Sequence, residues 1–501
     1  MIRRLLLAGA SLLPAPAAAE TLREALVRAY KSNPTITAQR ASQRATDETV
    51  PIARAAGLPT VDARSSYSQN LIRGGNSLTN PQRQLNGFAG VTVPVYTGGA
   101  VTNSVRAAET RVEAGRATLR SVEATTFSDV VSAYNDVIRD EAIVGLNTQN
   151  VRVLDTNLRA SRDRFQVGDL TRTDVAQSEA RLSLARAQLQ GAQATLIASR
   201  ENYISLVGDA PGSLEPPPPL PSLPATSDAA VEAALRDSPA LLAAQKQRDA
   251  TRFDVRAARA QRLPQFGVTI GQNYNNFLGS LGSGQGFSTR QSGTSTVAGV
   301  SLQVPIFQAG RVGAQVRQAQ ALRAQAIENA TGTERQVIAA TRSSFAIWKS
   351  SQLVIESAEA AVSANRLSLE GVRAENSVGT RTILDILNAE QELLNSQVTL
   401  VTARRDAYVA GFALLAAMGH AEAGDLGLDG GPLYDPVANY NRVRHSINDF
   451  ASDGEPGAVA TRTTGTPAQT AVVTKPLDAE LDTPVDRNPA LTTGAASPNR
   501  Q

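Results

Sequence analysis

The stretch Val93-Pro94-Val95-Tyr96-Thr97-Gly98-Gly99 returns 211 residues later as Val304-Pro305-Ile306-Phe307-Gln308-Ala309-Gly310. Segments in which apolar and polar residues alternate precede both copies. A very long pattern of helical period follows both copies. The repeated stretch therefore marks a junction between strand and helix that occurs twice in one chain.

Further matches at nearly constant offsets show that the whole unit is duplicated. Asn33-Pro34 matches Ser238-Pro239, and Leu58-Pro59 matches Leu263-Pro264, both at an offset of 205 residues. At an offset of 211 residues, Val167-Gly168, Thr171, Asp174 and Glu179 match Val378-Gly379, Thr382, Asp385 and Glu390. The offset grows across the Gly/Ser-rich run 279–293, where a longer exposed loop costs little. We predict two structural repeats, 20–208 and 227–419, joined by a Pro-rich linker at 209–226.

In each repeat, a helix with Pro at its first position, capped by Asn33 or Ser238, is predicted to run to Leu58-Pro59 or Leu263-Pro264. One β-hairpin is predicted to follow it, at about 60–96 and about 265–307. About ten residues of alternation between turn residues is typical of a transmembrane β-strand. The same pattern suits a soluble hairpin with one solvated face, so the strands alone leave both interpretations open.

Each hairpin is followed by a long helical hairpin, at about 98–207 and about 310–418. Small and apolar residues recur in a sustained heptad pattern, and no Pro occurs between Val101 and Val207. This pattern predicts coiled coils, and 98–166 would extend about 100 Å at 1.5 Å per residue. A free-standing rod is one alternative. However, four strands cannot close a barrel, so a membrane location requires several chains to pool their strands.

The chain ends have a different character from the repeats. Residues 1–19 show the basic start, short apolar core and small-residue cleavage site of a signal peptide. The extension 420–501 is predicted to be largely disordered from about 453, because that part lacks periodicity and is rich in Thr, Ala, Pro and Gly. We expect its removal to leave assembly nearly unchanged.

Composition argues against an enzyme and against a cofactor site. The chain has no Cys and two His, His420 and His445, so thiolate or zinc sites and a Ser/His/Asp triad lack raw material. The 49 basic residues are nearly balanced by 46 acidic ones, and no basic stripe of a nucleic-acid-binding protein is visible. We expect no catalytic residue, metal ligand, cofactor or nucleic-acid partner.

The duplication, its hairpins, the two strand-to-helix junctions and Ser377-Val378-Gly379-Thr380-Arg381-Thr382-Ile383-Leu384-Asp385-Ile386-Leu387 resemble the TolC-type family of outer-membrane efflux proteins. The resemblance covers about 20–419. It implies a mainly α fold with membrane β-structure: a homotrimer with four strands per chain, a 12-stranded barrel in outer-membrane lipid and an α-helical barrel in the periplasm. It also implies a passive exit duct for small molecules or unfolded proteins. The implied partners are a periplasmic adaptor and an inner-membrane ABC or RND pump.

The resemblance also assigns a gate near the Gly turns. Arg381 matches the family's gate arginine, and Thr173 and Asp174 match its partners on a neighbouring chain. Asp385 matches an acidic ring that narrows the entrance. The interpretation without the family is helix capping, because Thr171 to Asp174 and Thr382 to Asp385 both fit Thr-x-x-Asp.

Two residues depart from the family pattern. Asn376 stands where the best-known members have a Tyr that helps to tie the gate, and Asn388 stands where they have a second Asp ring. We therefore expect a less tightly tied gate and a less acidic entrance. The alternative function is a periplasmic coiled-coil adaptor or structural protein, and the choice between drug efflux and protein secretion stays open.

Overall fold

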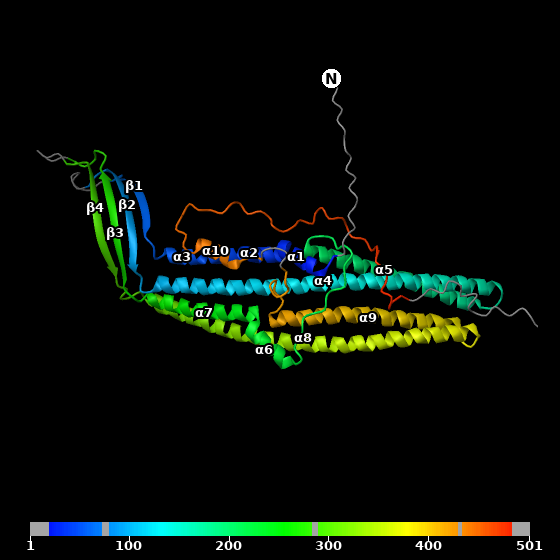
Figure 1. The fold of residues 1–501 in the computed structure, drawn as a ribbon. Coiled ribbons are helices and arrows are strands. Elements are labelled where there is room, and N and C mark those ends of the chain that lie inside the picture. The colour runs from blue at the N-terminus through cyan, green and yellow to red at the C-terminus, as the bar shows by residue number, and fades with distance from the viewer. Residues whose placement is uncertain (1–19, 73–79, 283–288, 429–432, 483–501) are drawn as a thin grey trace, which may run out of the picture.

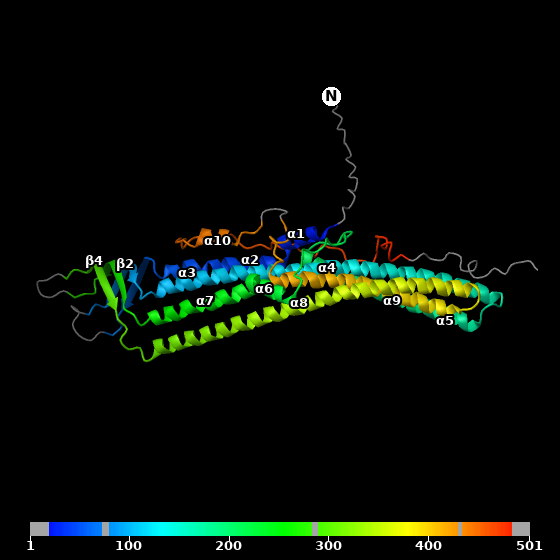
Figure 2. The same cartoon turned by 60° about the horizontal axis from the view of Figure 1, so that its bottom comes forward.

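The computed structural model describes residues 20–72, 80–282, 289–428 and 433–482, so the predicted signal peptide 1–19 lies outside the described residues. The chain is an elongated bundle of helices with a four-stranded sheet at one end (Figures 1 and 2). In chain order the elements are α1 Leu22–Ser32, α2 Pro34–Asp47, α3 Thr49–Ala55, β1 Thr60–Gln69, β2 Arg83–Tyr96, α4 Ala100–Gln166, α5 Arg172–Val207, α6 Ser227–Asp237, α7 Pro239–Ala260, β3 Gln265–Asn276, β4 Ser292–Gln303, α8 Arg311–Ser377, α9 Ile383–Met418 and α10 Pro436–Val443.

The two long helical hairpins have identical dimensions. Helices α4 and α8 each have 67 residues, and the returning helices α5 and α9 each have 36. Gly168 (φ +83°) and Gly379 (φ +81°) supply the left-handed backbone that the two tight turns require. Among the described residues, no helix is both long and apolar enough to cross a membrane.

The four strands form one antiparallel sheet in the order β1-β2-β3-β4. The hairpins of the two repeats join because β2 pairs with β3, from Leu85 opposite Asn276 to Tyr96 opposite Phe266. The register shifts between Pro94 and Tyr96, where the proline cannot donate to the ladder. Many large apolar side chains of this sheet are exposed in the single chain, among them Val61, Tyr67, Ile270, Val300 and Leu302.

One sequence-based expectation about the helices is wrong. The first repeat was expected to have a single helix from Pro34 to Leu58, but the structure has α2 and α3, separated at Glu48. Pro51 has no N–H to donate to the carbonyl of Asp47, so a continuous helix would lose that bond. In the second repeat, α7 is continuous, and the position equivalent to Pro51 is Arg256.

The largest hydrophobic core lies near the middle of the bundle, where α1 packs against α4 and α5. Phe127, Val130 and Leu196 are fully buried there. The hydroxyl of Tyr134 donates to the carbonyl oxygens of Glu20 (2.9 Å) and Glu215 (2.7 Å). These bonds attach the start of the first repeat and the Pro-rich linker to the long helix α4.

The C-terminal segment 469–482 differs from the predicted disorder. It has no helix or strand, but it lies along the helical hairpins, and Leu481 is buried with a 2 % exposed side chain. Helix side chains donate to its carbonyl oxygens: Arg200 Nη2 to Val472 (3.1 Å) and Gln397 Nε2 to Leu481 (2.9 Å). Sequence periodicity does not detect such order, because the donors belong to other elements. Residues 483–501 lie outside the described residues.

Candidate functional site

The tips of the two helical hairpins lie at the end of the molecule opposite the sheet (Figures 1 and 2). Both tips are built the same way, by a capping box at the start of the returning helix. Asp174 Oδ2 accepts from the backbone N (2.9 Å) and the hydroxyl (2.7 Å) of Thr171. Asp385 Oδ2 accepts equivalent bonds from Thr382, at 2.9 Å and 2.8 Å. Capping, the interpretation from the residues alone, is therefore correct for both carboxylates.

Capping leaves Asp385 charged and partly exposed. The hydroxyl and the backbone of Thr382 hold the pKa of Asp385 below its ordinary value, because both hydrogen bonds favour the carboxylate. The residue is half-buried near the tip, so solvent reaches part of it. Asp385 can therefore cap α9 and present a negative charge to anything that enters between the tips.

Arg381 is tied to its own hairpin in the single chain. Its Nε lies 2.7 Å from Glu375 Oε2, and this pair raises the pKa of the Arg381 guanidinium. Asn376 Nδ2 donates to the carbonyl of Arg381 (2.7 Å), which holds the loop. Within the described chain, the Arg381 side chain pairs with Glu375 and forms no hydrogen bond or ion pair with Thr173 or Asp174, and Thr173 is exposed.

Asn388 has a role that the sequence did not indicate. Its Oδ1 accepts a hydrogen bond of 2.8 Å from Nη2 of Arg181, which lies on α5. The bond joins the two helical hairpins close to their tips. Nothing in the sequence pairs residues 207 positions apart, so Arg181 was missed.

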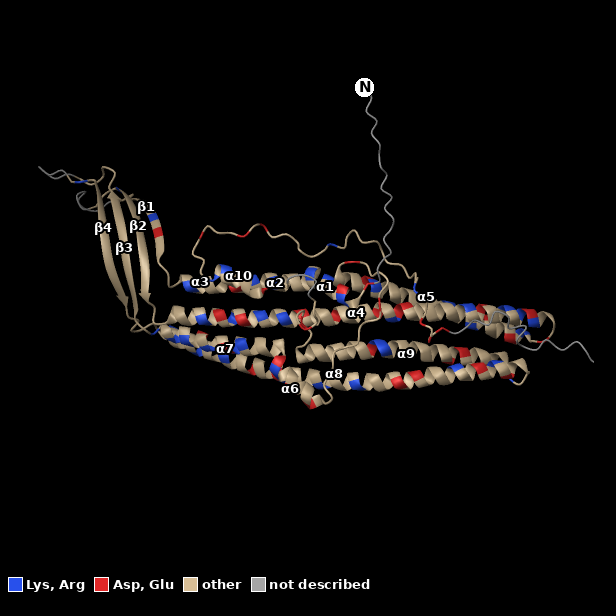
Figure 3. Cartoon of the chain, in the orientation of Figure 1, with Lys and Arg blue, Asp and Glu red and all other residues tan. Residues whose placement is uncertain are grey.

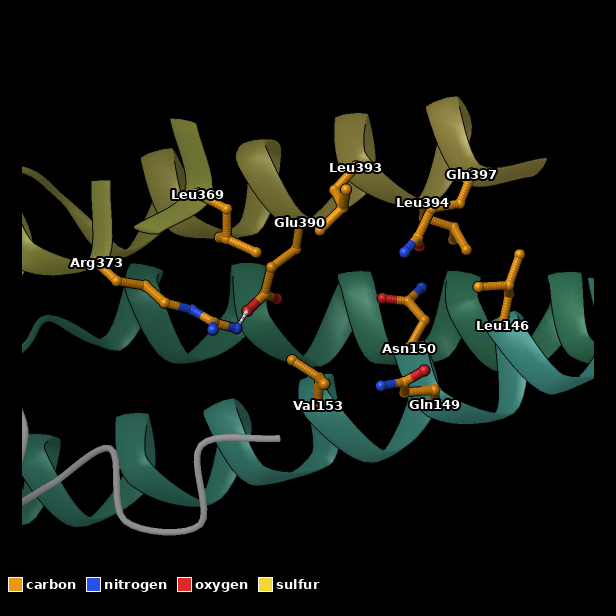
Figure 4. Close-up of a pocket in the computed structure, with 10 residues that line it drawn as sticks. All are labelled: Leu146, Gln149, Asn150, Val153, Leu369, Arg373, Glu390, Leu393, Leu394 and Gln397. Atoms are coloured by element: carbon orange, nitrogen blue, oxygen red, sulfur yellow. Dashed lines mark hydrogen bonds and ion pairs between the residues drawn. The ribbon is translucent and has the colours of Figure 1, made fainter. Parts of the chain in front are cut away.

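An ion pair within the second hairpin has a buried carboxylate, and a side chain of the first hairpin also bonds to that carboxylate (Figure 4). Arg373 Nη2 on α8 donates to Glu390 Oε1 on α9 (3.1 Å), and Asn157 Nδ2 on α4 donates to both carboxylate oxygens (3.1 and 3.0 Å). Burial raises the pKa of Glu390, and Arg373 opposes that shift. The carboxylate borders a cavity of about 40 Å³, which Asn150 also lines. Asn150 Nδ2 is buried without a hydrogen-bond partner in the described chain.

The first repeat contains the same pair in a different environment. Arg162 and Glu179 occupy the equivalent positions at the offset of 211 residues, 3.8 Å apart, and both side chains are more than half exposed. Sequence comparison matched Glu179 with Glu390, but it did not show that only one of them is buried.

Within the described ranges, no three His, Cys, Asp or Glu side chains gather as metal ligands would. The tips instead have exposed, long charged side chains, such as Arg172 and Arg381, around two tight turns. Hydrogen bonds also join the two hairpins there.

Comparison with known proteins identifies the class. The family model described as "Outer membrane efflux protein" matches residues 25–209 and 230–420. The chain is 34% identical over 441 residues to the outer membrane efflux protein BepC of Brucella suis biovar 1 (strain 1330), covering 88% of this chain and 94% of BepC. It is 26% identical to the outer membrane protein TolC of Escherichia coli (strain K12), covering 84% and 86% of the two chains.

The fold agrees with this match. The structure of the Campylobacter jejuni CmeC outer membrane channel superimposes with a TM-score of 0.70 at 16% identity, covering 85% of this chain and 90% of that one. The family match favours the channel over the alternative of a periplasmic adaptor. The chain belongs to the outer membrane efflux protein family, and it is an outer-membrane channel of TolC-type fold with its helical tube in the periplasm.

Proposed function

We propose that three copies of this chain form a passive exit duct, closed at the periplasmic end by the tips of the helical hairpins. One observation supports the proposal most directly. A four-stranded sheet with exposed apolar side chains is joined to two helical hairpins of equal length. Four strands are too few to close a membrane barrel, and twelve are enough. Equal hairpins end at one level, which is what a ring-shaped closure needs.

Arg381 is proposed to link neighbouring chains by donating to Asp174 or Thr173. Its Nε is already used by Glu375, but a guanidinium has five N–H donors, and its terminal nitrogens remain to bridge to a second acceptor. An exposed pair contributes only about 0.2–1 kcal/mol. Three such links around a threefold axis sum to about 0.6–3 kcal/mol, which shifts the closed–open equilibrium by roughly 3-fold to 150-fold.

Removal of the link should open the duct. Arg381→Ser, Asp174→Ala and the double variant are expected to raise the conductance of trimers in planar bilayers, with the double variant no more open than the stronger single variant. Arg172→Ser is the matched control, because Arg172 is also exposed at a tip, one residue past the capping threonine. Wild-type conductance in all three variants would exclude this gate.

Asp385 is proposed to form an acidic ring at the entrance, and Asn388 to leave that ring single. Asp385→Ala should therefore reduce cation preference and block by multivalent cations without the rise in conductance expected for Arg381→Ser. Because Asn388 accepts from Arg181, Asn388→Asp should strengthen the contact between hairpins as well as add charge. Reversal potentials in a salt gradient separate the two effects.

The partners are proposed to be a periplasmic adaptor and an inner-membrane pump of the ABC or RND class. Relatives of this chain are named for alkaline protease secretion and for cobalt-zinc-cadmium resistance, which are very different cargoes. Related channels that are named for such different processes favour a model in which the pump, rather than the channel, selects what is exported. In-cell crosslinking at the tips followed by mass spectrometry identifies the pump, and crosslinks to the sheet end instead would contradict the proposed orientation.

A further inference from the structure

Four exposed arginines lie at the end of α7 that is nearest the sheet: Arg252, Arg256 and Arg259 within the helix and Arg262 just after it. Their spacing of four, three and three residues places the three helical ones on one face. Among the described residues, none of the four pairs with a carboxylate. Figure 3 shows this end of α7 marked by basic residues.

The fold of the repeat does not require these charges. At the offset of 205 residues, the equivalent positions in the first repeat are Asp47, Pro51, Arg54 and Gly57. Only one of the four is basic, yet both copies lead into equivalent hairpins. The arginine stripe, Arg252, Arg256, Arg259 and Arg262, is therefore a property of the second repeat alone.

The C-terminal extension shows which side of the helical layer is the outer one. Glu113, Arg116 and Arg120 lie on one face of α4, at spacings of three and four residues. The Arg116 guanidinium lies 4.9 Å from the ring centroid of Tyr440, and Arg120 Nε lies 2.7 Å from Glu422 Oε1. The extension thus covers this face of α4. Three such extensions on the lumen side would obstruct the duct, so this face is the outer surface.

The arginine stripe lies beside this outer surface, because the helical period places its three helical members about 80–140° around α7 from Lys246. Lys246 Nζ on α7 lies 2.5 Å from Glu113 Oε2, which places Lys246 on the outer surface. Phe253, seven residues later, shares the face of Lys246. The guanidiniums of Arg252 and Arg256 lie 4.9 and 5.7 Å from the Phe253 ring centroid, at the edge of that face.

The stripe lies just below the level at which the sheet enters the membrane. Two exposed aromatic side chains lie at the end of the sheet next to the helices: Tyr96 ends β2 and lies opposite Phe266, and Phe307 follows β4. Such aromatics mark a membrane interface. Arg262 precedes Phe266 by four residues, and Arg256 and Arg252 lie about 6 and 12 Å along the axis from the end of α7. Three of the four arginines therefore lie within about 8 Å, a Debye length, of the end of α7 that leads into the sheet.

We propose that the arginine stripe binds the phosphates of anionic phospholipids in the membrane leaflet that faces the periplasm. A guanidinium donates two parallel hydrogen bonds to a phosphate, and an array of basic side chains beside a bilayer attracts anionic lipid. In a trimer the stripe recurs three times around the tube. The bound lipids would fix how deep the barrel sits in the bilayer.

The proposal is tested by native mass spectrometry of the full-length trimer. Trimers in detergent are mixed with equal amounts of phosphatidylglycerol and phosphatidylcholine of the same chain length, and the ratio of bound lipids is measured. Wild type should prefer phosphatidylglycerol, and replacing all four arginines with Gln should lower that preference at least threefold. The four Lys replacements should keep more than half of it. A concentration of 0.5 M NaCl should abolish the preference, because the contacts are screened.

Two double variants make the test independent of the quadruple variant's assembly. Arg259→Gln/Arg262→Gln should lose more preference than Arg252→Gln/Arg256→Gln, because the first pair lies nearer the membrane. The control is Arg335→Gln/Arg342→Gln, two exposed arginines of α8 that begin 24 residues after its first residue. Equal preference in wild type and the proximal double variant would overturn the proposal. An equal loss in the control would do so as well.

Discussion

Glu390 is buried in its ion pair with the partly exposed Arg373, whereas Arg162 and Glu179 form the equivalent pair at the surface. Removing one partner of a buried pair leaves an uncompensated charge, which costs about 3–5 kcal/mol unless the group neutralises. The Glu390 pKa is already raised, so protonation will relieve part of that cost.

We therefore predict that Arg373→Leu lowers the free energy of unfolding by about 2–3 kcal/mol. The matched control, Arg162→Leu, should change it by less than about 1 kcal/mol. Melting of detergent-solubilised trimers, followed by circular dichroism, compares the two. Equal shifts in the melting temperature would show that the Glu390 site is not effectively buried.

A second residue-scale prediction concerns pH. Burial raises the pKa of Glu123 from 4.5 to about 7, Arg40 opposes the shift, and Glu422 adds to it. The folded state therefore holds a proton that the unfolded state has lost between pH 4.5 and 7, so stability falls as the pH rises through this window. Glu123→Gln should remove the dependence. At pH 8, the variant should have a higher melting temperature than wild type, which corresponds to roughly 1–3 kcal/mol in the free energy of unfolding. At pH 4.5, the two melting temperatures should be the same.

The control for this variant is Glu109→Gln, an exposed glutamate on the same helix. It should follow the wild-type pH profile. A parallel profile for Glu123→Gln would mean that another group titrates.

At the scale of elements, the C-terminal segment 469–482 ties the two helical hairpins together. Leu477 lies so close to Gly145 of α4 that a Cβ there would meet it at 2.8 Å, and Leu481 is buried in a cluster with Leu146 and Leu393. Removal of this segment should therefore cost stability, contrary to what its composition indicates.

We predict that Leu481→Ala destabilises the trimer by about 2 kcal/mol. Gly145→Leu should release the segment from the helix side, although leucine is the better helix former. Limited proteolysis should cut the segment in both variants and spare it in wild type. Protection in Gly145→Leu would show that Leu477 is not held against α4.

The elements were predictable where the signal was local. The heptad pattern predicted the long helices α4 and α8, and Thr171 and Thr382 indicated where the returning helices α5 and α9 begin. The break at Pro51 was overlooked because the repeat comparison favoured one continuous helix. Order in 469–482 and the Arg181–Asn388 bond could not be predicted, because both depend on donors and acceptors far apart in the chain. The sequence identified Asp174 and Asp385 as caps, but it did not show that Arg381 pairs with Glu375, because that pair, only six residues apart, depends on how the Gly379 turn orients the two side chains.

At the scale of the whole molecule, the equal hairpins make a prediction about length. Deleting one heptad from each of α4, α5, α8 and α9 shortens the tube by about 10 Å and keeps every seam in register. Such a channel should still form trimers with low resting conductance. Deleting heptads from α4 and α5 alone should leave the two tips at different levels and raise the resting conductance. A closed, low-conductance trimer in the second case would show that the tips need not meet.

The matched lengths also restrict how this gene can change. An insertion or deletion in the helices of one repeat should need a compensating change about 211 codons away in the other repeat. The length of the periplasmic tube should therefore not change by a single mutation. Substitutions, by contrast, are free to differ between the halves, as Pro51 and Arg256 do. The two repeats are thus constrained to equal length across the periplasm, while their surface residues diverge.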